Sequence, residues 1–125
     1  MDRSPQEVIE EYLNEVQELG NYESAYLFSQ EGLPMAEVRG ETEITEDRLI
    51  EMSVLFQEVR KMADVMGGIS ELKEIILEGY NRKKIVFRFF EGFDQTVVLA
   101  LVIPPRKTYR GLTNSLMRLV QKLSK

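Results

Sequence analysis

The strongest hydrophobic pattern in the chain lies between Thr45 and Gly68, where apolar residues recur at helical spacing. With about 100° of rotation per residue, eight of them fall within one arc of roughly 140°. A narrower second stripe is interleaved with Glu58 and Lys61. The arc predicts a helix packed on a core, and we expect another subunit to cover the second stripe. The arc holds Leu49, Met52, Leu55, Phe56, Val59, Met62, Ala63 and Met66, and the second stripe holds Ile50, Val54 and Val65.

Helical spacing also marks both ends of the chain. The segment Ser4-Pro5-Gln6-Glu7 has the form of a capping box, with proline at the first helical position. Apolar residues continue at helical spacing as far as Leu19, and Gly20 is a natural stop. The segment from Tyr109 to Leu123 carries the same spacing. We therefore predict a helix at each end and the long helix in the middle, with Thr45 as its N-cap.

Five shorter segments have the composition of β-strands, and turn signals separate them. Pro34 places the second of these at a strand start or a sheet edge. The last is a continuous apolar run, which is typical of a strand buried on both faces. The predicted strands are Tyr22 to Ser29, Leu33 to Val38, Leu72 to Leu77, Lys84 to Phe90 and Thr96 to Ile103.

The element order is therefore αββαβββα, in a single domain over residues 1–125. A central strand buried on both faces needs helices on both sides of an antiparallel sheet. We expect an α+β fold with a five-stranded antiparallel sheet, the middle helix on one face and the terminal helices on the other. The middle helix then lies alone, so its second apolar stripe is exposed in a monomer and marks an interaction site.

Composition limits the function. The net charge of -5 argues against a general nucleic-acid binder and against a protein that binds anionic membrane surfaces. No apolar run approaches the roughly 18 residues of a membrane span, and the N-terminus lacks the apolar region of a signal peptide. We expect a cytoplasmic protein without direct membrane insertion.

The chain contains no cysteine and no histidine, which excludes thiol nucleophiles and removes the commonest general base and metal ligand. No phosphate-binding loop occurs, and Gly67-Gly68 precedes a predicted strand, so we interpret it as a helix stop. The acidic cluster at Glu41, Glu43, Glu46 and Asp47 lacks an EF-hand pattern. We interpret it as the solvated start of a helix. The sequence therefore predicts no catalytic residue, no cofactor and no metal.

With this element order, the chain resembles the Roadblock family of dynein-light-chain and MglB-like domains over about residues 6–123. The hairpin Ser29-Gln30-Glu31-Gly32-Leu33-Pro34-Met35-Ala36 resembles the family's S-x-[DE]-G-[LI]-P turn. The segment from Glu78 to Val86, then Glu91-Gly92 and the run Val97 to Val102, fits the family's closing strands. The profilin-like and PAS-like scaffolds are related αβ alternatives.

The resemblance implies a dimer, in which the middle helix and the strand after it pair with their symmetry mates. It places Ile50, Val54, Lys61 and Val65 against the partner helix. The pairing strand is Leu72 to Leu77, with Leu72, Glu74 and Ile76 at the interface. This agrees with the second apolar stripe, which the periodicity alone predicts.

The resemblance also implies a partner, because stand-alone prokaryotic members commonly bind small Ras-like GTPases. Some accelerate hydrolysis and others are scaffolds; in MglB-like members the GTPase sits across the paired helices, without a fixed catalytic arginine. Here the contact candidates are Glu51, Glu58, Arg60 and Asp64.

An arginine supplied in trans can stabilise phosphoryl transfer. For Arg39, Arg60, Arg106 and Arg110, a surface or ion-pair role is the favoured interpretation.

We therefore expect a homodimeric regulator or scaffold of a small Ras-like GTPase, which is not itself an enzyme. Two alternatives stay open. One is an architectural Roadblock subunit of a larger assembly, and the other is a small-molecule-sensing profilin-like or PAS-like domain.

Overall fold

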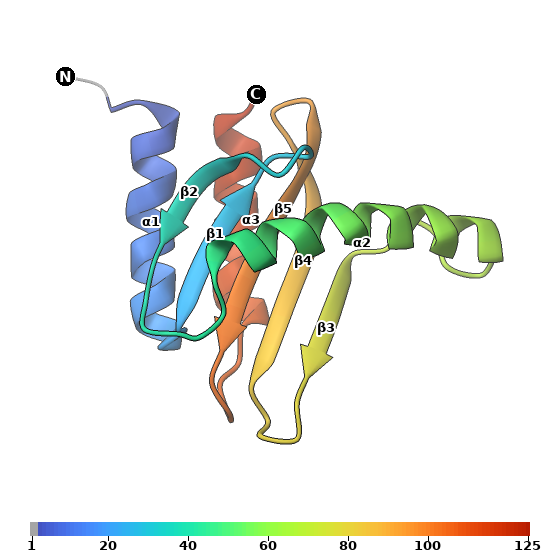
Figure 1. Ribbon diagram of the computed structural model, residues 1–125. Helices are drawn as coiled ribbons and strands as arrows, with labels where there is room; N and C mark the ends of the chain where they lie inside the picture. Colours follow the sequence, from blue (N-terminus) through green and yellow to red (C-terminus); the bar gives the residue numbers. More distant parts are fainter. Residues whose placement is uncertain (1–2) are drawn as a thin grey trace.

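The computed structural model describes residues 3–125 and confirms the predicted order, with three helices and a five-stranded antiparallel sheet (Figure 1). All eight elements lie within one or two residues of their predicted bounds. They are α1 Pro5–Gly20, β1 Ser24–Phe28, β2 Pro34–Val38, α2 Glu46–Met66, β3 Glu74–Glu78, β4 Lys84–Gly92, β5 Gln95–Ile103 and α3 Arg110–Leu123.

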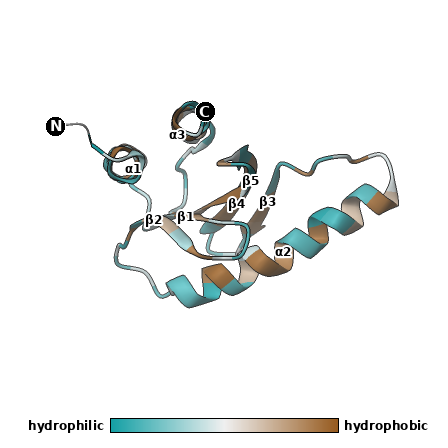
Figure 2. Cartoon of the chain, turned by 90° about the horizontal axis from the view of Figure 1, so that it is seen from above, coloured by the Kyte–Doolittle hydropathy of each residue, from teal (hydrophilic) through white to brown (hydrophobic). Residues whose placement is uncertain are grey.

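The strands follow the order β2-β1-β5-β4-β3, so β5 lies at the centre of the sheet. Figure 2 shows α1 and α3 on one face of the sheet and α2 alone on the other, as predicted. Alternate residues of β5 supply both cores. Leu99 and Leu101 belong to the cluster under α1 and α3, whereas Val98 and Ala100 belong to the cluster under α2. The prediction that this strand is buried on both faces is confirmed.

The helix starts follow the sequence signals. The Ser4 hydroxyl accepts a hydrogen bond of 3.2 Å from the backbone N–H of Glu7, and the Thr45 hydroxyl accepts one of 3.3 Å from Arg48. None of the helices described within residues 3–125 is long and apolar enough to cross a membrane.

The turn between β1 and β2 packs directly on α2. Gly32 adopts φ +89°, which a side chain would strain, and an added Cβ would lie 3.0 Å from the Ile50 side chain and 3.1 Å from that of Val54. The Ser29 hydroxyl closes the turn by accepting a hydrogen bond from the backbone N–H of Leu33. The predicted Glu31-Gly32 turn therefore also fixes the position of the first half of α2.

One prediction about α2 is wrong. Leu49, Phe56 and Ala63 of the main arc face the sheet, but three further members of the arc are exposed. The inner face of α2 is completed by the polar residues Ser53 and Arg60, which no apolar pattern reveals. The helix also runs past the outer strand β3, so its C-terminal part has no sheet beneath it (Figure 2). The exposed members are Leu55 at 59%, Met62 at 63% and Met66 at 79%.

Candidate functional site

Several exposed apolar residues lie on the side of α2 that faces away from the sheet. We call this group the outer α2 surface and define it as Val54, Leu55, Met62, Val65 and Met66, all of them exposed. Val65 is the most exposed, at 86%. An apolar cluster of this kind on one helix is typical of a protein–protein interface.

Charged residues on the same side of the helix are held in local ion pairs. Lys61 Nζ lies 3.2 Å from Glu58 Oε1, and Arg48 Nη1 lies 3.1 Å from Glu51 Oε2. All four side chains are exposed, so these pairs add little stability. A partner that approaches the outer α2 surface would meet Glu51, Glu58 and Lys61 together with the apolar residues.

The β3 edge of the sheet lies beside this surface. Within the described residues β3 pairs only with β4, so its other edge presents unpaired backbone groups. Ile76 on this strand is 41% exposed, and Leu77 is also exposed. The edge and the projecting end of α2 lie on the same side of the molecule (Figures 1 and 2). The edge can therefore accept a further strand while the outer α2 surface accepts a further helix.

Three of the predicted interface residues make contacts within the chain. Ile50 is partly buried against the α2-side core, and Leu72 is partly buried with its carbonyl oxygen bonded to Arg60. Glu74 belongs to an ion cluster on the α3 side of the sheet. Of the predicted set, Val54, Lys61, Val65 and Ile76 are the exposed members.

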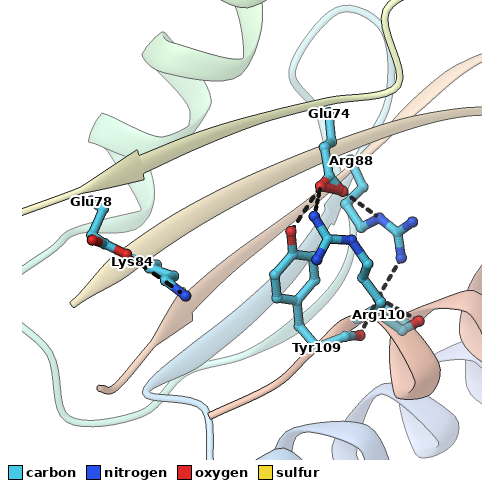
Figure 3. Close-up of polar contacts among 7 residues, drawn as sticks. Glu74, Glu78, Lys84, Arg88, Tyr109 and Arg110 are labelled. Atoms are coloured by element: carbon cyan, nitrogen blue, oxygen red, sulfur yellow. Dashed lines mark hydrogen bonds and ion pairs between the residues drawn. The ribbon is translucent and has the colours of Figure 1, made fainter. Parts of the chain in front are cut away.

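Glu74 is the centre of the ion cluster (Figure 3). Its carboxylate lies 3.3 Å from Arg88 Nε and 3.1 Å from Arg110 Nη2, and it accepts a 2.7 Å hydrogen bond from the Tyr109 hydroxyl. Arg88 in turn donates to the hydroxyl of Thr113 on α3. Burial, together with the bond to Glu74, raises the pKa of Tyr109 to about 12. The cluster ties the edge strand β3 to β4 and to the start of α3.

Arg60 and Asp64 hold the connection between α2 and β3. Arg60 Nε donates a 3.1 Å hydrogen bond to the Leu72 carbonyl oxygen, and its guanidinium lies 4.9 Å from the centre of the Phe89 ring. The Asp64 carboxylate accepts a 3.0 Å hydrogen bond from the backbone N–H of Glu71. Of the four predicted GTPase-contact residues, Arg60 and Asp64 are therefore bonded to the backbone of this connection, whereas Glu51 and Glu58 are in ion pairs along the helix.

One residue of the predicted acidic cluster at the start of α2 forms an ion pair. Arg39 Nη2 lies 3.0 Å from Glu46 Oε2 and 3.3 Å from Glu37 Oε1. Burial and the neighbouring Glu37 raise the pKa of Glu46. Glu46 is thus bound rather than solvated, whereas Glu41, Glu43 and Asp47 are exposed as predicted. No group of three potential metal-ligating side chains occurs among residues 3–125.

An apolar groove lies between the start of α1 and the β1–β2 turn, with a volume of about 430 Å³. Two of its polar side chains are already used, since Ser29 accepts from the Leu33 N–H and Gln95 accepts from the Gln30 N–H. A small ligand would find few free polar groups to orient it. The groove is lined by Pro5, Gln6, Ile9, Ser29, Leu33, Pro34, Met35, Phe93 and Gln95.

A scan against known protein families gives no match, and no curated protein sequence matches the chain. Solved structures do match. The gliding protein MglB from Thermus thermophilus superposes with a TM-score of 0.74 at 14% identity, covering 99% of this chain and 93% of that one. A Roadblock/LC7 domain from Streptomyces avermitilis superposes with a TM-score of 0.64 at 14% identity, covering 91% and 92%.

The chain has the Roadblock fold. The predicted fold class, an α+β Roadblock-like arrangement with a five-stranded antiparallel sheet, is confirmed. A further Roadblock-fold structure, described as MglB with a tetrameric arrangement, matches with a TM-score of 0.70 at 15% identity and covers 98% of this chain and 95% of that one. Identities this low establish the shared fold, while partners have to be argued from the residues of this chain.

Proposed function

We propose that this Roadblock-fold protein is a homodimeric regulator or scaffold that binds a small Ras-like GTPase. The observation that carries the proposal is the position of the outer α2 surface beside the unpaired edge of β3. One partner copy can cover both features at once.

A second copy of the chain suits this surface because a two-fold interface is self-complementary. The helix supplies Val54, Leu55, Met62, Val65 and Met66, and β3 supplies a strand edge that can pair with its own mate. Leaving both exposed would be an aggregation hazard for a monomer. The tetrameric arrangement described for an MglB structure of the same fold is consistent with self-association.

The GTPase part of the proposal rests on the resemblance to MglB-like proteins and on the absence of a phosphate-binding loop in this sequence. The partner, rather than this chain, would bring the nucleotide. Among residues 3–125, the Glu51 and Glu58 side chains pair only with exposed basic residues of the same helix, so they can contact a GTPase that lies across the two paired helices.

The arginines favour regulation without a donated catalytic side chain. Arg39 is paired with two glutamates, Arg60 is bonded to the Leu72 carbonyl oxygen, and Arg110 is paired with Glu74. Each of these three would have to break these contacts before it could enter a GTPase active site. Arg106 is exposed and forms no ion pair among residues 3–125, but it lies in the β5–α3 connection, away from α2 (Figure 1). We therefore propose that any effect on hydrolysis comes from shaping the partner's own catalytic groups.

Light scattering tests the proposal. The protein is measured alone and mixed with Ras-like GTPases encoded in the same genome, each loaded with GDP or with a non-hydrolysable GTP analogue. We expect a dimer that gains mass with one nucleotide state of one GTPase. A dimer that ignores every GTPase in both states would support the architectural alternative, and a monomer would contradict the proposal.

A further inference from the structure

Two segments at one end of the sheet carry six basic residues and no acidic residue. They are the β3–β4 turn, residues 79–84, and the β5–α3 connection, residues 104–110. In the ladder between β4 and β5, Lys84 lies opposite Ile103, so the two segments leave the sheet side by side. Figure 1 shows both at the lower end of the molecule, away from the C-terminus. The basic residues are Arg82, Lys83, Lys84, Arg106, Lys107 and Arg110.

Three of these cations are neutralised by acidic residues. Lys83 pairs with Glu23 at 3.0 Å, Lys84 with Glu78 at 3.7 Å, and Arg110 with Glu74 at 3.1 Å. Within residues 3–125, the other three, Arg82, Arg106 and Lys107, form no ion pair, and all three are exposed. The two loops therefore carry unneutralised positive charge on a protein whose net charge is -5.

Two of the exposed arginines also have an unusual backbone conformation. Arg82 and Arg106 both have φ of +67°, in the left-handed region where glycine or asparagine is the less strained residue. Tyr80, in the same turn as Arg82, is fully exposed. The tips of two adjacent loops thus present two arginines, a lysine and an aromatic ring to solvent.

We propose that this basic end docks on an anionic phospholipid surface. Lys and Arg side chains are attracted to anionic headgroups, and a tyrosine ring is well suited to the headgroup layer. Because salt screens charges beyond about 8 Å at physiological ionic strength, the positive charge of these loops affects binding to the headgroups more than acidic residues further away do.

The shape of this end also favours a membrane over a polymer. The cations lie on the tips of two loops at the end of the sheet (Figure 1), which a broad flat surface can touch together. An acidic peptide or a nucleic-acid strand is usually held in a groove that follows its backbone. Ile44, which follows the exposed Glu41 and Glu43, lines one cavity together with Lys83, so these two acids flank the β3–β4 turn on the α2 side.

Co-sedimentation with vesicles tests the proposal independently of dimerisation and of any GTPase. The probes are phosphatidylcholine vesicles with and without phosphatidylglycerol, at low and at physiological salt. The test variant replaces Arg82, Arg106 and Lys107 with alanine. The control variant makes the same change of charge at the other end of α3, at Arg118, Lys122 and Lys125, which are likewise exposed.

We expect the unaltered protein to bind the anionic vesicles and not the neutral ones. Because each Lys or Arg near an anionic surface contributes roughly a factor of five, the test variant should lose roughly 100-fold in partitioning and the control less than about threefold. Tyr80→Ser should weaken binding without changing its salt dependence. No preference for anionic vesicles, an equal loss in both triple variants, or binding to single-stranded RNA or polyglutamate in place of vesicles would overturn the proposal.

Discussion

Replacing Arg60 with alanine removes a side chain that ties the inner face of α2 to the segment leading into β3. The guanidinium donates to the Leu72 carbonyl oxygen at 3.1 Å and lies over the Phe89 ring at 4.9 Å from its centre. It also comes within 3.5 Å of the Thr96 hydroxyl, which is at the limit of a hydrogen bond. The variant loses these contacts together, because alanine has no atom that reaches any of them.

The expected cost follows from the two close contacts. A hydrogen bond from a charged donor contributes about 1.5–3 kcal/mol, and a cation–π contact at a partly exposed site about 0.5–1 kcal/mol. Because Arg60 is only partly buried, we take the lower end. The free energy of unfolding should fall by about 2 kcal/mol.

The matched control is Arg48→Ala on the same helix. Among residues 3–125, Arg48 pairs only with Glu51, and both side chains are more than half exposed. Such exposed pairs contribute about 0.3–0.5 kcal/mol. Both variants are compared by urea denaturation at one protein concentration, and hydrogen exchange follows residues 67–78. We expect faster exchange there in Arg60→Ala alone. If Arg60→Ala destabilises the protein no more than Arg48→Ala does, then Arg60 does not hold α2 to the segment before β3.

Four further predictions concern the outer α2 surface, the proposed GTPase contact and the ion cluster around Glu74. Val65→Glu should give a folded monomer, because this side chain is 86% exposed in one chain and a charge there destabilises only the interface. Circular dichroism with light scattering tests this, and an unchanged dimer would refute it. Val54→Glu should also weaken the dimer, but with some loss of folding stability, because Val54 touches the β1–β2 turn. Reversing Glu51 and Glu58 to lysine together should weaken binding of a GTPase at least tenfold by titration calorimetry while the dimer persists, and undiminished binding would move the contact elsewhere. The raised pKa of Tyr109 stabilises the folded protein below pH 10, and this stabilisation is lost as the pH rises towards about 12. Tyr109→Phe should therefore reduce the fall in unfolding free energy over this pH range and remove one phenol from the absorbance titration near pH 12.

The fold could be predicted largely from short-range patterns. The capping signals at Ser4 and Thr45 mark helix starts that the structure confirms. The unbroken apolar run from Thr96 to Ile103 identified the central strand, since only a strand covered on both faces excludes polar residues over that length. Each of these signals is encoded within a few residues of the element that it predicts.

The rotation of α2 could not be predicted in the same way. Its inner face includes Ser53, whose hydroxyl bonds to the Ile50 carbonyl oxygen, and Arg60, whose partner Leu72 is twelve residues away. Polar residues that find such partners inside a fold are invisible to a hydrophobic pattern. The part of the helix that extends beyond β3 also leaves Met62 and Met66 without a core to cover.

The role of Glu74 depended on similarly distant contacts. The sequence placed it in the pairing strand, but its side chain meets Arg88, Tyr109 and Arg110, which lie 14 to 36 residues further along the chain. The net charge of -5 is a sum over the whole chain, so it does not reveal the exposed basic residues at one end of the sheet. Both features emerge only when distant segments are brought together.

The central claim is that the outer α2 surface and the β3 edge are covered by a second copy of the chain. Light scattering over a dilution series, with Val65→Glu in parallel, tests it most directly. The account predicts a mass twice the 14.5 kDa of one chain for the unaltered protein and a single-chain mass for the folded variant. An unaltered protein that stays at 14.5 kDa across the whole series would contradict it.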